Sequence, residues 1–257
     1  MMTFGETFDR KGPSILGVDP WVAGSPKTGT KRQLLSEAER SRLAVIASIV
    51  RFKKGEDIYR AGDRADAIFN IISGVVKSYS GNGGDRIVAF LFPNDLFGLS
   101  AEGIYTNAAR ALTAVTAYRL PISALRNRLS KDALLEYHVI CKLCEELRQA
   151  QRHAFLLGER RADARIATFL QMLEQLQAAN GDAASEIYLP MDRSDIGEYV
   201  GLSLAAVSRT FASLVRRNVI KFRDRRRVKI TDRAAFDRIV ADSGGRRTGR
   251  KARGRGV

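Results

Sequence analysis

The stretch from residue 190 to residue 230 carries hydroxyl and guanidinium groups at a helical spacing. Ser208, Arg209 and Arg216 would share the outer face of one helix, because its opposite face is apolar. That inner face would consist of Val207, Phe211, Leu214 and Val215. A guanidinium group donates paired hydrogen bonds to planar acceptors, and the edge of guanine is a common one. These residue types therefore predict recognition chemistry on an exposed helix.

Two short helices and a tight turn would present this face. Asp192 is the expected cap of a first helix, which buries Ile196 and Val200 on one side. Gly201 would end that helix in a sharp bend, and Ser203 would cap the second helix. Such a pair of helices is the helix-turn-helix unit, whose second helix enters the major groove. The pattern predicts double-stranded DNA as a partner.

The charge distribution of the chain favours the same partner. Strands at Val219–Phe222 and 227–230 would flank the run from Arg223 to Arg227 and form a basic wing. The net charge is +15, and residues 186–257 hold 18 Lys and Arg against 8 Asp and Glu, a surplus of 10. Such a surplus attracts phosphate, although by itself it also fits a solvated surface or an RNA-binding tail. Together with the helix-turn-helix pattern, it indicates DNA.

Composition excludes several classes of protein. With 257 residues and 45% hydrophobic side chains, the chain has enough length for one large or two ordinary globular domains. No apolar run approaches the roughly 18 residues of a membrane span, and the N-terminus lacks the apolar stretch of a secretion signal. Its two cysteines, Cys141 and Cys144, cannot build a disulfide framework. We therefore expect a bacterial protein in the cytoplasm, without a membrane partner.

The region before residue 130 has the pattern of a small β-barrel. A helix is expected first, over Ser36–Ile49, burying Leu43, Ile46 and Ala47. Short strands punctuated by glycine follow at a spacing typical of a barrel or sandwich. The expected strands are Val50–Lys53, Asp57–Tyr59, Ala67–Ile72, Val75–Ser80, Arg86–Phe92 and Ala114–Leu120. Gly81 to Gly84 should form a hairpin turn.

One long helix is expected over Ser130–Leu157. Its apolar residues recur at alternating steps of three and four, which favours packing against a second copy of the same helix. This seam consists of Ile140, Leu143, Leu147, Ala150, Ala154 and Leu157. A helix buried against its own domain is the alternative. Gly158 would break the helix and form a hinge before a further helix over Arg161–Ala178.

A barrel, a long helix, a hinge and a winged helix-turn-helix, in that order, resemble the cAMP receptor protein/FNR (Crp/Fnr) family of bacterial transcription regulators. The resemblance covers residues 35–235, and its strongest parts are KKGEDIYRAGDRADAIFNIISGVVKSY, FPNDLFG and the helix-turn-helix. Four glycines match those that turn the family's barrel: Gly55, Gly62, Gly74 and Gly98. The run RHAFLLGERRADARIATFL is similar to the hinge of the FNR/FixK-type branch.

An α+β chain with five parts is expected. Composition predicts a flexible N-terminal arm (1–30) and a basic disordered tail (243–257). The resemblance implies the three parts between them: a jelly-roll sensor β-barrel of the cyclic-nucleotide-binding type (31–130), a dimerisation helix (131–158) and a winged helix-turn-helix domain (159–242). It also implies a homodimer on a palindromic DNA site, with RNA polymerase as a protein partner. No Ser/His/Asp set or phosphate-binding glycine loop stands out in the sequence, so no enzymatic activity is expected.

The resemblance also assigns DNA contacts residue by residue. They are Arg193, Ser203, Leu204, Ala205, Ser208 and Arg209. Arg209 would read a guanine, and Arg193 would pair with phosphate, unless Asp195 or Glu198 holds it instead. Ala205 stands where relatives have a glutamate, and Leu204 stands where some have an arginine. We therefore expect a TTG-type half-site with altered discrimination nearby.

The residues that bind a cyclic nucleotide in the family are missing at the matching positions. Leu99 follows Phe97 and Gly98 where the family has a glutamate for the ribose, and alanines stand where an Arg-Ser or Arg-Thr pair holds the phosphate. Arg110 and Glu102 are possible displaced substitutes. Hence we expect a regulator that does not depend on cAMP; the alternatives are a nucleotide-dependent regulator and a signalling module acting through a protein partner.

No cofactor or metal site is expected. An iron–sulfur cluster of the FNR type needs N-terminal cysteines, and residues 1–35 have none. His138, Cys141 and Cys144 follow each other at steps of three along the long helix, which could hold a metal or sense oxidation. The outer two are about 9 Å apart by helical rise alone, so structural cysteines are the favoured interpretation.

Overall fold

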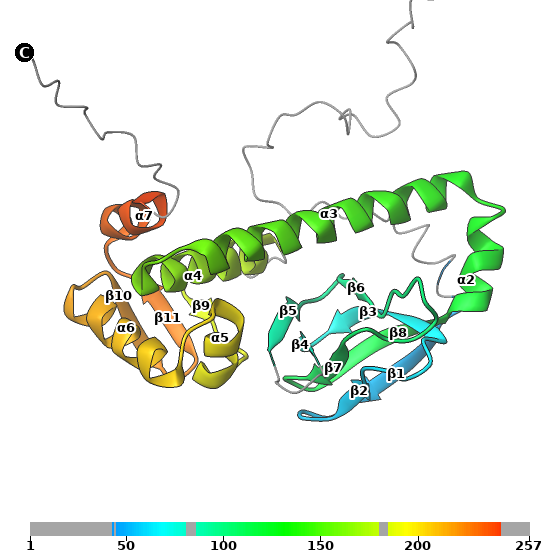
Figure 1. Cartoon of the computed structure of the whole chain (residues 1–257), viewed down its shortest axis with the longest axis horizontal. Helices are drawn as coiled ribbons and strands as arrows, with labels where there is room; N and C mark the ends of the chain where they lie inside the picture. Colours follow the sequence, from blue (N-terminus) through cyan, green and yellow to red (C-terminus); the bar gives the residue numbers. More distant parts are fainter. Residues whose placement is uncertain (1–42, 44, 81–85, 180–184, 243–257) are drawn as a thin grey trace, which may run out of the picture.

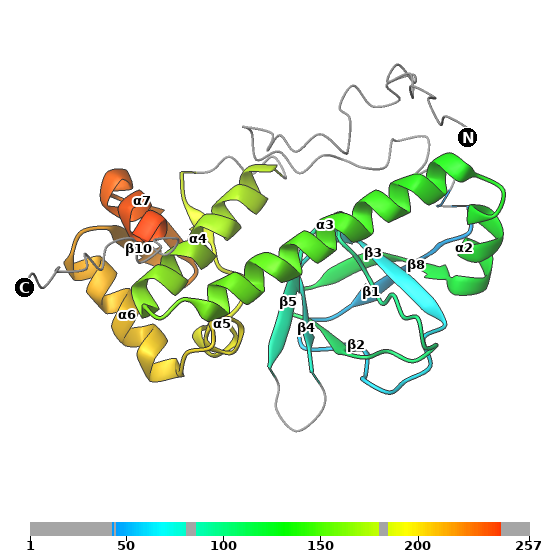
Figure 2. The ribbon, with the colours of Figure 1, turned by 45° about the horizontal axis from the view of Figure 1, so that its top comes forward.

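The computed structural model describes residue 43 and residues 45–80, 86–179 and 185–242. A β-sandwich lies at one end of the molecule and a helical, winged domain lies at the other (Figure 1). Helix α3 runs along both of them (Figure 2). The α+β architecture predicted from the sequence is confirmed. Within the described part of the chain, no helix combines the length and apolar character that a membrane span requires.

The sandwich consists of two four-stranded antiparallel sheets. One has the order β1-β8-β3-β6 and the other β2-β7-β4-β5. The strands are β1 (Ser48–Phe52), β2 (Asp57–Tyr59), β3 (Ala67–Ser73), β4 (Val76–Tyr79), β5 (Ile87–Leu91), β6 (Leu96–Phe97), β7 (Ala108–Ala111) and β8 (Val115–Pro121). Their inward side chains alternate with outward ones and form a core between the sheets.

Gly74 shows why this region is punctuated by glycine. It lies between β3 and β4 with φ at +92°, a conformation that favours glycine. A Cβ atom at this position would lie 2.2 Å from the carbonyl oxygen of Ala114, which is too close for any other residue. The tight turn therefore depends on the residue type that the sequence supplies.

Three helices follow the sandwich in the sequence, and the first of them was not expected. Helix α2 (Ile122–Leu129) ends at Ser130, and α3 (Ala133–Gly158) begins after Asp132, whose side chain accepts a hydrogen bond from the backbone N–H of Leu135. The prediction of a single helix from Ser130 is thus wrong at its start, because the turn at 130–132 separates two helices. The predicted end at Leu157 lies one residue before the observed end at Gly158. Helix α4 (Ala162–Ala179) follows.

The winged domain is built on α4. It adds β9 (Ile187–Tyr188), α5 (Arg193–Val200), α6 (Leu204–Arg216), β10 (Ile220–Asp224), β11 (Arg227–Ile230) and α7 (Arg233–Ala241). The capping predictions are confirmed: Asp192 accepts from the N–H of Asp195, and Ser203 accepts from that of Ala206. Gly201 ends α5 in the left-handed conformation, with φ at +68°.

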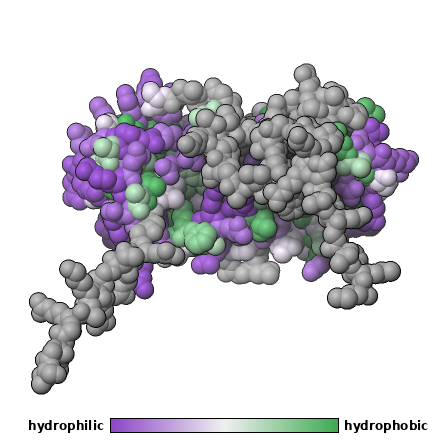
Figure 3. Space-filling model, turned by 90° about the horizontal axis from the view of Figure 1, so that it is seen from above, coloured by the Kyte–Doolittle hydropathy of each residue, from purple (hydrophilic) through white to green (hydrophobic). Residues whose placement is uncertain are grey.

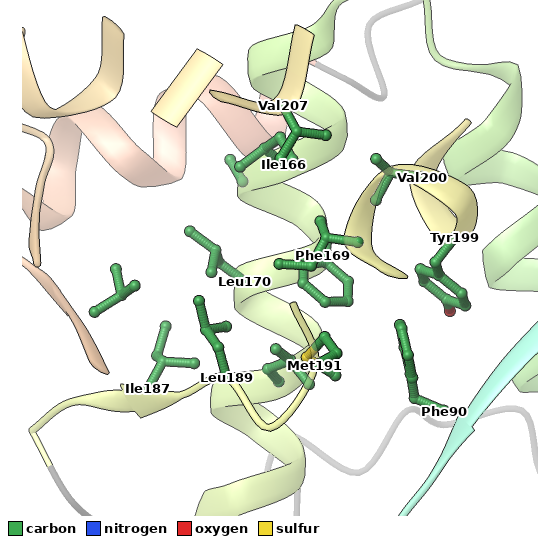
Figure 4. Close-up of a cluster of buried hydrophobic side chains, with 14 of the residues drawn as sticks. Phe90, Ile166, Phe169, Leu170, Ile187, Leu189, Met191, Tyr199, Val200 and Val207 are labelled. Carbon is green, nitrogen blue, oxygen red and sulfur yellow. The ribbon is translucent and has the colours of Figure 1, made fainter. Parts of the chain in front are cut away.

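A continuous apolar core joins the sandwich to the winged domain. Phe90, on β5, reaches across to Phe169 on α4 and Tyr199 on α5, with ring centroids 6.1 and 5.0 Å apart (Figure 4). His153 of α3 stacks on Tyr199 at 4.0 Å, and its Nε2 lies 2.7 Å from the Tyr199 carbonyl oxygen. The barrel, α3 and the helix-turn-helix therefore meet at Tyr199.

Several sequence predictions differ from the structure. The helix expected over Ser36–Ile49 is wrong at its C-terminal end, because β1 begins at Ser48 and pairs with β8; residues 36–42 and 44 lie outside the described chain. Strands β6 and β7 were not expected. The N-terminal arm, the Gly81–Gly84 hairpin and the basic tail also lie outside the described residues.

Candidate nucleic-acid interface

Helix α6 has one buried face and one exposed face. Val207, Phe211 and Leu214 are buried as predicted, but Val215 is 40% exposed. Thr210 takes the remaining inner position, and its hydroxyl donates to the Ala206 carbonyl at 2.8 Å. A hydroxyl paired within the helix can be buried without cost, because its hydrogen bond is satisfied. Replacing Val215 by Thr210 on the buried face leaves the predicted outer face of Ser208, Arg209 and Arg216 unchanged.

The outer face of α6 is open at its N-terminal half. Leu204, Ala205 and Arg209 are exposed, and Ser208 is half-buried. Among the described residues, no ion pair holds the Arg209 guanidinium. Beside it is a shallow hollow of about 380 Å³ between α6 and the start of α4. Its lining residues are Ala162, Asp163, Ala206, Arg209, Thr210, Ser213 and Arg216. The exposed helix can therefore approach a ligand with its guanidinium available.

Arg193 lies at the first position of α5, where its side chain is exposed. Its guanidinium carbon is 5.4 Å from the ring centroid of Phe211 and 5.5 Å from that of Phe222. The two rings attract the cation and hold it at the junction of α5, α6 and the wing. Asp195, a possible partner of Arg193 by sequence, instead pairs with Lys77. The Arg193 guanidinium is therefore not neutralised by Asp195, which is consistent with a contact to phosphate.

The wing is basic, but one of its arginines turns inward. Lys221, Arg225 and Lys229 are exposed, whereas Arg226 donates a hydrogen bond to the Leu189 carbonyl at 3.1 Å. Arg226 therefore ties the wing to the segment before α5. The sequence of the basic run from Arg223 to Arg227 did not distinguish Arg226, which supports the wing, from its exposed neighbours. In the view from above, the lobe that contains this domain is mostly hydrophilic on its surface (Figure 3).

Helix α3 leaves an apolar face in solvent. Of the residues in the predicted seam, Ile140, Leu143, Leu147, Ala150 and Ala154 are exposed; Leu147 is 60% exposed. Leu157 is half-buried against the core of the winged domain. Phe155, which the heptad pattern did not include, is 82% exposed. An apolar strip of this length on a helix is typical of a surface that a partner covers.

The interior of the sandwich is occupied by aromatic rings. Tyr105 stacks on Tyr59 with ring centroids 3.8 Å apart, and its hydroxyl donates to the Ala67 carbonyl at 2.8 Å. Phe69 and Phe97 stack beside them. Burial raises the pKa of both tyrosines, since it disfavours the phenolate. Both rings therefore act as neutral core residues.

The two displaced candidates for a nucleotide clamp, Arg110 and Glu102, lie in different surroundings. Arg110 Nε lies 2.6 Å from Asp57 Oδ1, and this guanidinium also faces the Tyr79 ring. That pairing lowers the pKa of Asp57, because the guanidinium favours the carboxylate. Glu102 is exposed in a loop, and Leu99 is 38% exposed. These side chains are thus paired elsewhere or directed to solvent.

The cysteines of α3 are free thiols, one half-buried and one exposed. Within the part of the chain that the structure describes, no group of three or more His, Cys, Asp and Glu residues has the arrangement of a metal site.

A jelly-roll sandwich, a long connecting helix and a winged helix-turn-helix with an open recognition helix together define a class of DNA-binding regulator. Comparison with known proteins agrees. Residues 49–132 match the cyclic nucleotide-binding domain family, and residues 164–239 match the Crp-like helix-turn-helix domain.

Individual relatives extend the match over most of the chain. The nitrogen fixation regulation protein FixK of Bradyrhizobium diazoefficiens is 33% identical over 189 residues, 72% of this chain and 79% of that protein. The transcriptional activator protein FnrA of Stutzerimonas stutzeri is 34% identical over 163 residues, 62% of this chain and 67% of that protein. The solved structure of FixK2 from Bradyrhizobium japonicum superposes with a TM-score of 0.70 at 30% identity, covering 76% of this chain and 97% of that one.

The chain belongs to the Crp/Fnr family of DNA-binding transcription regulators. Members of this family bind DNA as dimers, and they are regulators rather than enzymes.

Proposed function

We propose that this protein is a homodimer in which each α6 reads one half of a palindromic DNA site without requiring cAMP. The observation that carries the proposal is the exposed N-terminal half of α6, where Arg209 is held by no partner among the described residues. A guanidinium on an open helix suits the O6 and N7 atoms of guanine. Ser203, Leu204, Ala205 and Ser208 would face the neighbouring bases, and Arg193 would contact phosphate.

The homodimer is supported by the exposed apolar strip on α3. Two such strips would bury each other in a parallel pair, because Ile140 and Leu147 lie two helical turns apart on one side. We add Phe155 to the proposed interface and remove Leu157, which packs mainly against its own winged domain. A two-fold dimer then presents two recognition helices, which is the symmetry of a palindrome.

Independence from cAMP is supported by the filled sandwich. The stacked rings of Tyr59 and Tyr105 occupy the space between the sheets, and small residues around them make room for the rings. The positions that would hold a ribose and a cyclic phosphate carry Leu99, Ala108 and Ala109. A nucleotide would have to displace packed aromatic side chains and would find no charged clamp. We also propose a cytoplasmic location, with RNA polymerase as the protein partner.

Selection from a pool of random duplexes tests the DNA proposal. The purified protein should enrich a palindrome whose half-sites contain TTG and are centred about one helical turn apart. Enrichment of single asymmetric sites, or of no sequence at modest ionic strength, would refute it. Calorimetry with cAMP and cGMP should give no binding heat. An increase of tenfold or more in operator affinity on adding either nucleotide would refute independence from cAMP.

The dimer is tested by placing a charge in the seam. Leu147→Glu should convert the protein to a monomer in analytical ultracentrifugation and weaken operator binding by about 100-fold, because buried like charges would face each other across the axis. Leu134→Glu is the matched control. It places the same charge on an exposed leucine of α3 outside the seam, and it should leave both properties unchanged.

A further inference from the structure

An ion pair links the sandwich directly to the helix-turn-helix. The Lys77 Nζ atom lies 2.7 Å from Oδ1 of Asp195, and the two residues are 118 positions apart in the sequence. Lys77 is on β4 and Asp195 is in the first turn of α5. Their side chains are only 16% and 12% exposed, so the pair is largely shielded from water. It is thus an interdomain contact at short range and in a poorly solvated place.

Asp195 also takes part in the cap of α5. Its N–H donates to Asp192 Oδ1 at 2.9 Å, and its own carboxylate accepts from the N–H of Asp192 at 3.3 Å. Arg193, the proposed phosphate contact, lies between these two residues on the same turn. One oxygen of Asp195 therefore fixes the turn internally, and the other fixes it to the barrel. Through Asp195, Lys77 restrains the segment that carries Arg193.

The contacts around the ion pair are mostly apolar. Phe90 packs against Phe169 and Tyr199 (Figure 4). It is also the cross-strand neighbour of Lys77 on the paired strands β4 and β5. These rings hold the two domains together by non-directional apolar burial, while the hydrogen bond between His153 Nε2 and the Tyr199 carbonyl orients the C-terminal end of α5. A hydrogen-bonded ion pair has narrow geometry, and the Lys77–Asp195 pair orients the first turn of α5 on the barrel.

We propose that Lys77 is a positioning residue for operator binding, acting through Asp195 on the orientation of the helix-turn-helix. This inference rests on the proposed reading of a palindrome. Two recognition helices must meet successive major grooves at a fixed angle, so a small rotation of each winged domain weakens the specific complex. Non-specific DNA demands no such register, and its binding depends mainly on total charge.

Two substitutions that replace a charged side chain with an uncharged one test the proposal: one removes the cation of the pair and the other removes the anion. Lys77→Met keeps an apolar stem, and Asp195→Asn keeps an amide oxygen that can accept the capping hydrogen bond. On electrostatics alone, losing a cation should weaken DNA binding and losing an anion should strengthen it. If the pair sets orientation, each variant leaves a shielded charge without its partner, and both should weaken operator binding by roughly tenfold. Random duplex should change by less than about twofold for either.

Fluorescence anisotropy measures the affinity of each full-length variant for the selected operator and for random duplex. The double variant Lys77→Met with Asp195→Asn should bind the operator at least as tightly as the single variant with the lower affinity. The reason is that the two substitutions remove the same contact. Lys77→Arg should restore operator affinity to within about threefold, since the cation and its donor are kept. Arg119→Met is the control, because its 2.7 Å pair with Asp66 joins two residues of the sandwich domain and does not reach the winged domain. It should leave the operator affinity unchanged.

The inference is overturned if Asp195→Asn binds the operator as tightly as the wild type or more tightly. It is also overturned if both duplexes lose affinity equally, or if Arg119→Met has the same effect as Lys77→Met. Should Lys77→Met fail to fold, Asp195→Asn and Lys77→Arg decide the question. A wild-type protein with no preference for any duplex would instead refute the proposed function, so the two failures are distinguishable.

Discussion

The outer face of α6 and the interior of the sandwich differ in whether their polar side-chain groups have partners within the protein. On α6, Arg209 is exposed and has no ion-pair partner among the described residues. Inside the sandwich, Tyr105 stacks on Tyr59 and donates its hydroxyl to the Ala67 carbonyl. One region leaves hydrogen-bonding capacity for a ligand, whereas the other satisfies that capacity with its own atoms.

This difference separates what the fold requires from what a ligand requires. The two family matches cover most of their respective domains, but the helix-turn-helix carries an exposed guanidinium, whereas the aromatic rings inside the sandwich pack against one another. Gly98 illustrates the closed state of the sandwich: an added Cβ atom would lie 3.3 Å from both the Phe69 and Tyr105 rings. The barrel form is kept while its centre is packed as a core.

The strongest test of the closed interior is Tyr105→Ala. Removing a buried ring leaves a cavity, and the free energy of unfolding should fall by roughly 3 kcal/mol. Urea unfolding followed by circular dichroism measures the change. Tyr105→Phe keeps the ring and loses only the hydrogen bond to Ala67, so it should cost about 1 kcal/mol. Equal stability of Tyr105→Ala and the wild type would show that the ring is not part of the core.

The matching test of the open face is Arg209→Ala. Operator binding should weaken by about 1–3 kcal/mol, with relaxed choice at one guanine, because a bidentate contact to O6 and N7 is lost. Anisotropy with operators substituted at each position measures both effects. Arg238→Ala, on the exposed side of α7, removes an equal charge away from α6 and serves as the control. Equal losses on operator and random duplex would contradict base reading by Arg209.

A smaller effect is expected at the edge of the open face. Arg193→Ala should weaken binding to all duplexes by roughly 0.5–1 kcal/mol, since a phosphate contact carries no sequence information. The slope of log affinity against log salt should become shallower by about one unit. Titrations at several salt concentrations measure that slope. A loss confined to the operator would assign Arg193 to base reading instead.

The helix-turn-helix could be predicted closely because its determinants are local. Asp192, Gly201 and Ser203 act within three or four residues of their own positions, through capping and a left-handed turn. Strands Asp57–Tyr59 and Arg227–Ile230 were placed at their observed bounds for a similar reason: clear turns flank them. Local chemistry decided these elements.

Other features depend on distant partners and have no local signal. Lys77 and Asp195 are 118 residues apart, so no spacing rule connects them. Strand β7 consists mostly of alanine, which gives no strand signal, although its pairing with β2 and β4 makes it a central strand. Leu157 fits the heptad pattern, yet the winged domain half-buries it. Tertiary packing decided these residues.

The smallest expected effect lies at the boundary between the two regions, where His153 stacks on Tyr199. Burial lowers the pKa of His153 because it disfavours the imidazolium, and the positive charge of Arg86 acts in the same direction. The unfolded chain therefore binds a proton more readily than the native one below about pH 6.5, the ordinary value for histidine. Stability contributed by the neutral ring is fully present above that pH and is lost as the pH falls through the lowered pKa.

Urea unfolding at pH 7.5 and pH 5 should thus show a loss of stability at the lower pH, and His153→Phe should show a smaller loss. Phenylalanine can keep the ring stacked on Tyr199 but cannot take up a proton. Any loss of stability that remains in the variant comes from other titrating groups. Subtracting it from the loss in the wild type leaves the contribution of His153. An identical change in both proteins would mean that His153 titrates alike in the native and unfolded states, and that this boundary is open to water rather than packed.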